Sequence, residues 1–145
     1  MEIRKIAPGG MSEAMDLVWE VFSKFEAPEY SAEGVAAFRD FISSREALDS
    51  LTVYGAFEGE TLLGVIAMRD VSHISLFFVR EEHHRKGVGR ALFEHAALEC
   101  GIKRITVNSS PYAVPVYRAL GFSQTAGEQL QDGIRYTPME YEATE

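Results

Sequence analysis

Apolar residues recur with helical spacing in two early segments of the chain. In residues 14–25 and 35–42 they come every three or four positions, which puts them on one face of a helix. Ser12 and Ser31 stand before these segments, where a hydroxyl can accept a hydrogen bond from the first helical turn. Pro28 separates the two segments. The pattern therefore predicts two consecutive helices.

Shorter segments are predicted to be strands, because β-branched and aromatic residues alternate with polar ones or run together. They are residues 2–7, 51–58, 61–69, 72–80, 104–108, 122–126 and 135–141. Two further helices are predicted at residues 88–99 and 111–120, each followed by a glycine that can end it. The resulting order is β-α-α-β-β-β-α-β-α-β-β, which predicts an α/β fold.

Two glycines qualify this pattern. Gly59, followed by Glu60, predicts a tight hairpin between the second and third strands. Gly34 lies inside the second predicted helix, where it costs about 1 kcal/mol relative to alanine.

Composition indicates one folded unit. The chain has 145 residues, of which 46% are hydrophobic and 11% aromatic, so we expect a single domain over residues 1–145. No apolar stretch approaches the roughly 20 residues that span a bilayer, and the N-terminus lacks an apolar signal core. Cys100 is the only cysteine, so an internal disulfide is excluded. These features predict a cytoplasmic protein with no membrane partner.

The charge is acidic overall but locally basic. A net charge of −8 argues against nucleic acid as a partner. Residues 80–90, however, hold four Lys or Arg residues against two Glu residues. Because screening at physiological salt acts over about 8 Å, this local positive charge can attract an anion despite the acidic whole.

This basic segment is a glycine-containing turn, residues 83–90, between a predicted strand and a predicted helix. The first N–H groups of a helix have no partner within it, and the helix dipole favours negative charge there. Gly87 and Gly89 lack a Cβ, so a phosphate can approach the backbone and the chain can take positive φ. The basic turn therefore predicts a site for a phosphorylated ligand.

Two familiar phosphate motifs do not fit the basic turn. A P-loop places Lys and a hydroxyl residue after the glycines, whereas Lys86 precedes them and no hydroxyl residue follows. A dinucleotide-binding fingerprint needs Gly or Ala where Leu92 stands. A nucleotide-binding fold is therefore disfavoured.

The turn resembles the acyl-CoA-binding motif of the GCN5-related N-acetyltransferases (GNAT), Gln/Arg-x-x-Gly-x-Gly/Ala. Gly87-Val88-Gly89 matches its second half, while His84 stands at the Gln/Arg position, which is a departure. Because that motif binds the pyrophosphate mainly through backbone N–H groups, we expect His84 to weaken the match without breaking it. The resemblance implies that the turn residues hold the cofactor: His84, Arg85, Lys86, Gly87, Val88, Gly89, Arg90 and Ala91.

A second motif of the same family, Ala-x-x-x-Tyr-x-x-x-Gly-Phe, is matched downstream by Ala113, Tyr117, Gly121 and Phe122. Many members carry Asn seven residues before the tyrosine, to bond the CoA arm, and Ser110 stands there instead. Ser110 is also expected to cap a helix that begins at Pro111. The resemblance adds Asn108, Ser110 and Tyr117 to the cofactor-binding residues.

The resemblance implies a fold and a reaction. The fold is a mixed, mostly antiparallel sheet whose central fourth and fifth strands run parallel but splay apart, with helices on both faces. In the family an amine attacks the thioester of acetyl-CoA directly. The thioester oxygen is polarised by a backbone N–H at a bulge in the fourth strand, which we expect near Phe78 or Val79. Tyr117 is expected to act as the general acid for the leaving thiolate.

The base that deprotonates the amine is not identified by any motif. An alkyl ammonium with a pKa near 10.4 costs about 4–5 kcal/mol to neutralise at pH 7, so a base or a water chain is expected. His73 is the best candidate by its intrinsic pKa, and Glu20 and Glu26 are alternatives. Adjacent His83 and His84 seldom share one ion, and no metal site is expected.

The sequence thus predicts an N-acetyltransferase that uses acetyl-CoA as co-substrate and a small-molecule or peptide amine as acceptor. No nucleic-acid partner is expected, and a homodimer is left open. The alternative is a non-catalytic acyl-CoA-binding sensor or regulatory domain: His84 and Ser110 favour it mildly, and Tyr117 argues against it.

Overall fold

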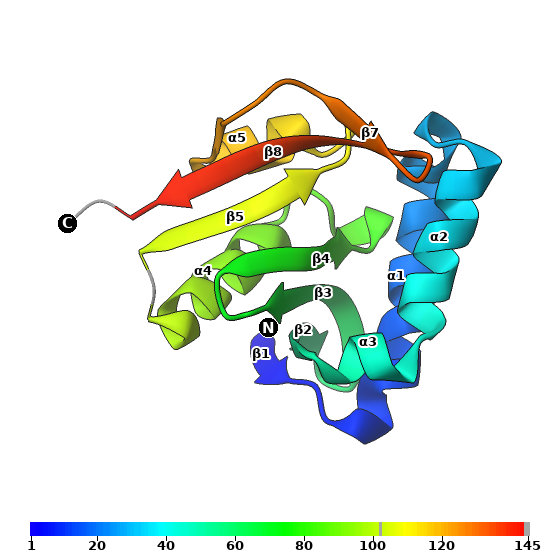
Figure 1. The fold of residues 1–145 in the computed structure, drawn as a ribbon. Coiled ribbons are helices and arrows are strands. Elements are labelled where there is room, and N and C mark those ends of the chain that lie inside the picture. Colours follow the sequence, from blue (N-terminus) through cyan, green and yellow to red (C-terminus); the bar gives the residue numbers. More distant parts are fainter. Residues whose placement is uncertain (102, 144–145) are drawn as a thin grey trace.

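A computed structural model describes residues 1–101 and 103–143, and one mixed β-sheet runs through it (Figure 1). The strands follow the order β1-β2-β3-β4-β5-β8-β6, and β7 pairs with β8 off this path. Every pair is antiparallel except β4 with β5. The strands are β1 (Glu2–Lys5), β2 (Leu51–Glu58), β3 (Thr61–Arg69), β4 (His73–Val79), β5 (Arg104–Ser109), β6 (Ser123–Gln124), β7 (Gln129–Gln131) and β8 (Ile134–Glu142).

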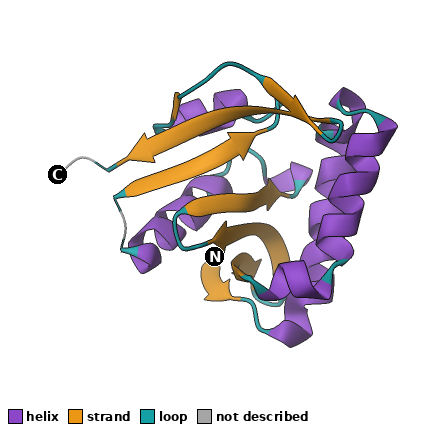
Figure 2. Cartoon of the chain, in the orientation of Figure 1, coloured by secondary structure: helices purple, strands orange, loops and turns teal. Residues whose placement is uncertain are grey.

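Helices cover both faces of the sheet (Figure 2). One face carries α1 (Met11–Phe25), α2 (Ala32–Ser43) and α3 (Arg45–Asp49). The other carries α4 (Val88–Cys100) and α5 (Val114–Leu120). Single 3-10 turns lie at Pro8–Gly10, Ala27–Glu29 and Glu81–His83. The predicted α/β class, with a mostly antiparallel sheet between helices, is confirmed.

The alternation of side chains along β3 divides the core into two clusters. Val65 and Ala67 pack under α1 and α2, whereas Ile66 and Met68 pack under α4. All four are 2% exposed or less, so β3 is buried on both faces. This double burial explains why its sequence is a continuous apolar run rather than an alternating one.

The parallel strands β4 and β5 are paired over a short stretch only. His73 faces Thr106 and Ile74 faces Val107, and no later residue of β4 is paired with β5. Beyond these pairs the two arrows diverge toward their C-terminal ends (Figure 1). The expected splay of the central strands is therefore confirmed, and it leaves the second half of β4 without a neighbour on that edge.

The bulge expected near Phe78 or Val79 lies elsewhere on β4. Ala67 pairs with Leu76 and Met68 pairs with Ile74, so Ser75 is the extra residue, while the pairing of Phe78 and Val79 with β3 is regular. An extra residue bends its strand and increases the local twist. The bulge thus comes directly after the last residue that pairs with β5, where it turns β4 away.

Several boundaries differ from the sequence prediction. Helix α1 begins at Met11, so Ser12 lies inside it. Helix α5 begins at Val114 with Ala113 as N-cap, and Ser110 instead accepts a hydrogen bond from the Ala113 N–H group at 3.2 Å in the turn before it. Ser31 caps α2 as expected, accepting from the Gly34 N–H group.

Helix α2 is held against the β7–β8 turn at Gly34. A Cβ at this position would lie 2.2 Å from the carbonyl oxygen of Gly133. The close approach of two backbones explains a glycine that helix propensity alone disfavours. It also sets the distance between α2 and the C-terminal part of the sheet.

We predict that Gly34→Ala destabilises the protein by about 1–3 kcal/mol, although alanine is the better helix former, because the new methyl group forces α2 away from Gly133. Gly9→Ala is the matched control, since a Cβ there meets no atom within 4 Å. Urea unfolding of both variants measures the effect. A Gly34→Ala protein as stable as the wild type would show that this contact is not tight.

Candidate active site

The basic turn leads into α4 through two residues with left-handed backbone. Arg85 has a φ of 64° and Gly87, the N-cap of α4, has a φ of 83°. The positive φ expected at Gly87 is confirmed, and a Cβ there would meet no atom within 4 Å, so the backbone is open to a ligand. Gly89 lies inside the first helical turn, where its Cβ would touch Phe77 at 3.4 Å.

The N–H groups in the second part of this turn are free, whereas those of His83 and His84 donate to the carbonyls of Arg80 and Glu81. Among the described residues, the N–H groups of residues 85–90 find no acceptor, whereas the Ala91 N–H group donates to the Gly87 carbonyl at 3.0 Å. Ala91, expected among the cofactor-binding residues, therefore has its N–H group engaged inside the helix. Six successive free donors at the positive end of a thirteen-residue helix form a site for an anion such as a diphosphate.

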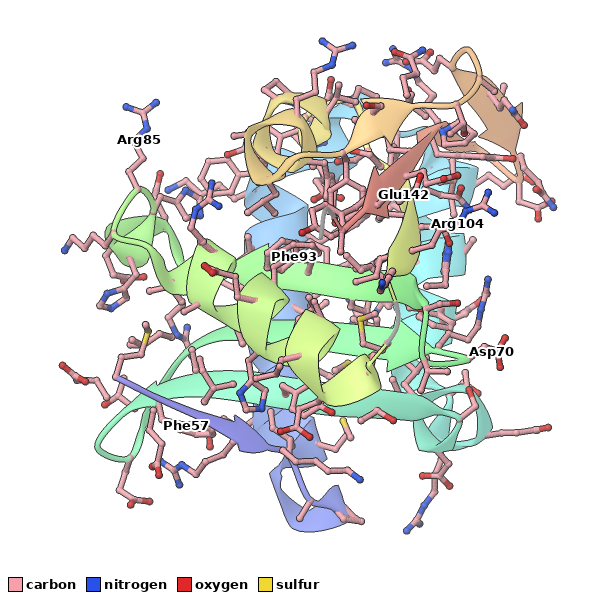
Figure 3. All side chains as sticks on the ribbon, turned by 90° about the vertical axis from the view of Figure 1, so that its left-hand side faces the viewer. Phe57, Asp70, Arg85, Phe93, Arg104 and Glu142 are labelled. Atoms are coloured by element: carbon pink, nitrogen blue, oxygen red, sulfur yellow. The ribbon has the colours of Figure 1, made fainter. Side chains whose placement is uncertain are left out.

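The cationic side chains of the turn point outward. Arg85 extends away from the body of the molecule (Figure 3). The side chains of Arg85 and Lys86 are exposed and make no hydrogen bond or ion pair with the described residues. Arg90 donates to the Ala119 carbonyl at 3.0 Å, which ties the start of α4 to the end of α5. Val88 is buried and anchors the helix in the core.

His84 is folded inward rather than toward the turn's surface. Its Nε2–H group donates to the Val79 carbonyl at 2.7 Å, and its ring lies 5.2 Å from that of Phe25. The imidazole thereby caps the open end of β4 and supports the turn. A structural role of this kind fits the departure from the family's Gln/Arg at that position.

Two cavities meet beside the gap between β4 and β5. The turn cavity, of about 310 Å³, extends from the gap to His84, Arg85 and Gly89. The α2 cavity, of about 200 Å³, extends from the gap toward α2 and the start of β8. The residues that line both cavities are Glu26, Phe77, Phe78, Ala113 and Tyr117.

Free backbone donors of β4 face this gap. The Arg80 N–H group donates to the Leu63 carbonyl of β3 at 2.9 Å, and successive residues of a strand direct their N–H groups to opposite edges. Val79 and Phe77 therefore direct their N–H groups toward the gap, and Phe78 directs its own toward β3. Of the two expected positions, the backbone of Val79 fits and that of Phe78 does not, although the Phe78 side chain lines both cavities.

Tyr117 comes from the middle of α5 and is 5% exposed. Its ring packs against Phe77 and Phe122, with centroid distances of 5.8 and 5.3 Å. Burial, and then the negative charge of Glu26, raise the pKa of Tyr117 well above its usual value of 10.0. The phenol is therefore protonated at any physiological pH and can only donate a hydrogen bond to an anion.

Glu26 directly follows α1, where the chain leaves the helix before Pro28. Burial, partly offset by a hydrogen bond from the Ser110 hydroxyl and reinforced by Glu29, raises the pKa of Glu26 from 4.5 to about 7. A carboxylate with a pKa near the working pH, at the junction of two cavities, suits proton transfer. The sequence offered Glu26 only as an alternative, because nothing in its neighbours along the chain indicates this burial.

His73, the first candidate for the base, lies away from both cavities. It stands at the closed end of the β4–β5 pair, where its Nδ1 is 2.8 Å from the Thr106 hydroxyl. Burial lowers its pKa. The assignment of His73 as the base stays a prediction; in this structure its ring links the two strands where they pair.

Two further expected residues lie at the α2 cavity. Asn108 and Ser110 both line it, and neither lines the turn cavity. Ser110 is buried and its hydroxyl group lowers the pKa of Glu26, while Asn108 is exposed at the end of β5. Phe77, which the sequence analysis did not single out, lines both cavities.

A larger groove lies elsewhere. It has a volume of about 560 Å³ and is lined by residues of α1, α2, α3 and β2, among them Trp19 and Arg39. It shares no residue with the basic turn or with the gap. Among the described residues, no helix is long and apolar enough to cross a membrane.

Solved structures share this fold. A GCN5-related N-acetyltransferase from Rhodopseudomonas palustris is 19% identical, with a TM-score of 0.80 over 97% of this chain and 94% of that one. The PaiA N-acetyltransferase from Thermoplasma acidophilum, in complex with coenzyme A, is 21% identical, with a TM-score of 0.78 over 97% and 98%. YjaB from Escherichia coli, in its apo form, is 20% identical, with a TM-score of 0.77 over 99% and 98%.

At these sequence identities, structural similarity shows a shared fold and nothing about function. The sequence itself matches the family model of the acetyltransferase (GNAT) domain over residues 26–143, which includes the basic turn, the gap between β4 and β5, and Tyr117. The chain belongs to the GNAT acetyltransferase family.

Proposed function

We propose that the protein transfers the acetyl group of acetyl-CoA to a primary amine by direct attack in a ternary complex. One observation carries the proposal: a cavity that begins at free helix N–H groups meets a second cavity at Glu26 and Tyr117. A donor and an acceptor can therefore each occupy one cavity and react where the two join. Each later step assigns a role to a residue of this junction.

The donor binds through the backbone. The diphosphate of CoA accepts hydrogen bonds from the free N–H groups of residues 85–90, with Arg85 and Lys86 adding positive charge nearby. The pantetheine arm enters the gap and lies against the unpaired edge of β4, where its amides pair with the backbone as an added strand would. With the arm running inward from residues 85–90 along β4, the thioester at its end reaches the junction of the two cavities.

Polarisation of the thioester comes from β4. Negative charge develops on the carbonyl oxygen as the amine attacks, and a fixed N–H donor stabilises it. Val79 and Phe77 are the donors whose N–H groups face the gap. We assign the role to one of these two groups.

The proton and the leaving group are handled by two side chains. The ammonium group of the acceptor pairs with the Glu26 carboxylate and gives it a proton. The free amine then forms the C–N bond, and as the C–S bond breaks the second proton of the nitrogen passes to the departing sulfur, so that the amide and the free thiol are released and Glu26 returns its proton to solvent. Tyr117 donates a hydrogen bond to the departing sulfur. Because its pKa lies above the value of about 8.5 typical of a thiol, the phenol stabilises the thiolate without giving up its proton.

We predict that Tyr117→Phe lowers kcat about 10²–10³-fold with little change in the KM for acetyl-CoA, because one hydrogen bond to the leaving group is lost. Tyr54→Phe is the matched control, since Tyr54 is also buried but lines neither cavity. Release of free thiol, followed with a panel of amines, measures both. An unchanged kcat in Tyr117→Phe would remove this role. A wild-type protein that binds acetyl-CoA yet releases no thiol with any amine would instead be the sensor.

The pH dependence tests Glu26. With a base of pKa about 7 and an ammonium substrate, kcat/KM should rise tenfold per pH unit below 7 and level off between 7 and roughly 10. The rise reflects deprotonation of Glu26, and the plateau ends where the free ammonium loses its proton.

In Glu26→Gln the enzyme captures only neutral amine, so kcat/KM should fall at pH 7.5 and keep rising with pH toward 10. Glu94→Gln, an exposed position in the middle of α4, is the control and should keep the wild-type profile. A plateau that survives in Glu26→Gln would show that another group accepts the proton.

A further inference from the structure

Aromatic rings make up a large part of the wall of the α2 cavity, beside smaller apolar and polar residues. Phe38 and Phe41 come from α2, Phe77 and Phe78 from β4, and Tyr30 from the segment just before α2. Aromatic faces attract both apolar groups and the cationic end of an ammonium-bearing chain.

These walls are held by the core behind them. The Phe38 ring stacks on that of Phe22 at 3.8 Å and meets that of Phe78 edge-on at 6.0 Å. Phe22 is fully buried and also contacts Tyr30 at 5.5 Å. The shape of the cavity is therefore set by packed rings rather than by mobile side chains.

The cavity carries one charge. Among the described residues that line it, Glu26 alone has an ionisable acidic or basic side chain other than tyrosine. The nearest guanidinium along the chain, that of Arg135 beside Ile134, donates from Nε and Nη2 to Glu128 at 3.2 and 3.1 Å and does not line the cavity. An ammonium group thus has a charged partner here, whereas a carboxylate or phosphate meets no Lys, Arg or His among the described lining residues.

Its volume limits the size of the guest. An apolar protein cavity of about 150 Å³ is known to hold a benzene molecule. At about 200 Å³ the α2 cavity has room for one ring and a short chain.

We infer that the acceptor is a small primary amine on a compact apolar body, about the size of one aromatic ring, and that it carries no anionic group. The inference rests on the proposed acetyl transfer and names its substrate class. The amine nitrogen lies at Glu26, at the junction with the turn cavity, and the apolar body fills the space between α2 and β4. We therefore expect amino acids, polyamines, sugars with amino groups and lysine-containing peptides to be poorer acceptors.

Initial rates with a matched panel of amines test the inference. The panel holds 2-phenylethylamine and hexylamine, then phenylalanine, spermidine, an aminoglycoside and a lysine-containing peptide. We expect kcat/KM for phenylalanine to be at least about 100-fold below that for 2-phenylethylamine, because the two differ by a carboxylate that would be buried without a partner. Spermidine, the aminoglycoside and the peptide should be similarly poor.

A pair of neighbouring alanines locates the site. Ala37 lines the cavity, whereas Ala36 is exposed on the same helix. Ala37→Leu should raise the KM for 2-phenylethylamine about tenfold while leaving that for ethylamine nearly unchanged. Ala36→Leu should change neither, and thermal unfolding confirms that both variants fold.

The outcomes separate this inference from the proposed function. Faster acetylation of phenylalanine, spermidine, the aminoglycoside or the peptide than of 2-phenylethylamine would overturn the inference and leave acetyl transfer standing. If no amine is acetylated, calorimetry of 2-phenylethylamine with the CoA-loaded protein decides. Binding that is weakened by Ala37→Leu and not by Ala36→Leu would keep the ligand class while the proposed reaction fails, and an absence of binding would overturn both.

Discussion

The candidate site depends on the early end of the pairing between strands β4 and β5. Strand β4 pairs with β5 at two residues and then turns away at the Ser75 bulge, so its second half has backbone N–H groups that face no strand. Buried N–H groups without partners are costly, and a ligand with amide groups of its own can satisfy them. After a single 3-10 turn at Glu81–His83 the chain reaches residues 85–90 of the basic turn, whose N–H groups are also free. Two sets of free donors, one on β4 and one at residues 85–90, thus lie at the two ends of the turn cavity, separated by the hydrogen-bonded N–H groups of Arg80, His83 and His84.

The chemistry at the junction of the two cavities follows from the burial of its two ionisable side chains. Burial raises the pKa values of both Glu26 and Tyr117, and the charge of Glu26 raises that of Tyr117 further. The effect gives the two groups different tasks: the carboxyl group can exchange a proton near neutral pH, and the phenol cannot. Ser110 tunes the first of them, since its hydroxyl group bonds the carboxylate and holds its pKa below the value that burial alone would impose.

Local signals predicted the regular parts of the fold well. The strands at 51–58 and 61–69 agree with β2 and β3 because apolar runs flank a Gly-containing turn, and Gly101 and Gly121 both end helices in left-handed conformation. Helix α3 and strand β7 were missed, since five and three residues are too few to show a period.

From the sequence, only the part of the candidate site that is built from backbone N–H groups could be predicted. Glycine spacing locates the basic turn, because free N–H groups and positive φ follow from local sequence. The bulge at Ser75 leaves no mark in residue type, so the direction of the N–H groups along β4 could not be assigned. The choice between His73 and Glu26 depends on which side chain tertiary packing brings to the gap, and intrinsic pKa carries no information about that packing.

The most direct test of this account is a crystal structure of the protein with acetyl-CoA bound. We expect the diphosphate within hydrogen-bonding distance of the N–H groups of residues 85–90, and the pantetheine arm along the free edge of β4 with its thioester near Tyr117. Acetyl-CoA bound instead in the groove lined by Trp19 and Arg39, with the gap between β4 and β5 empty, would contradict it.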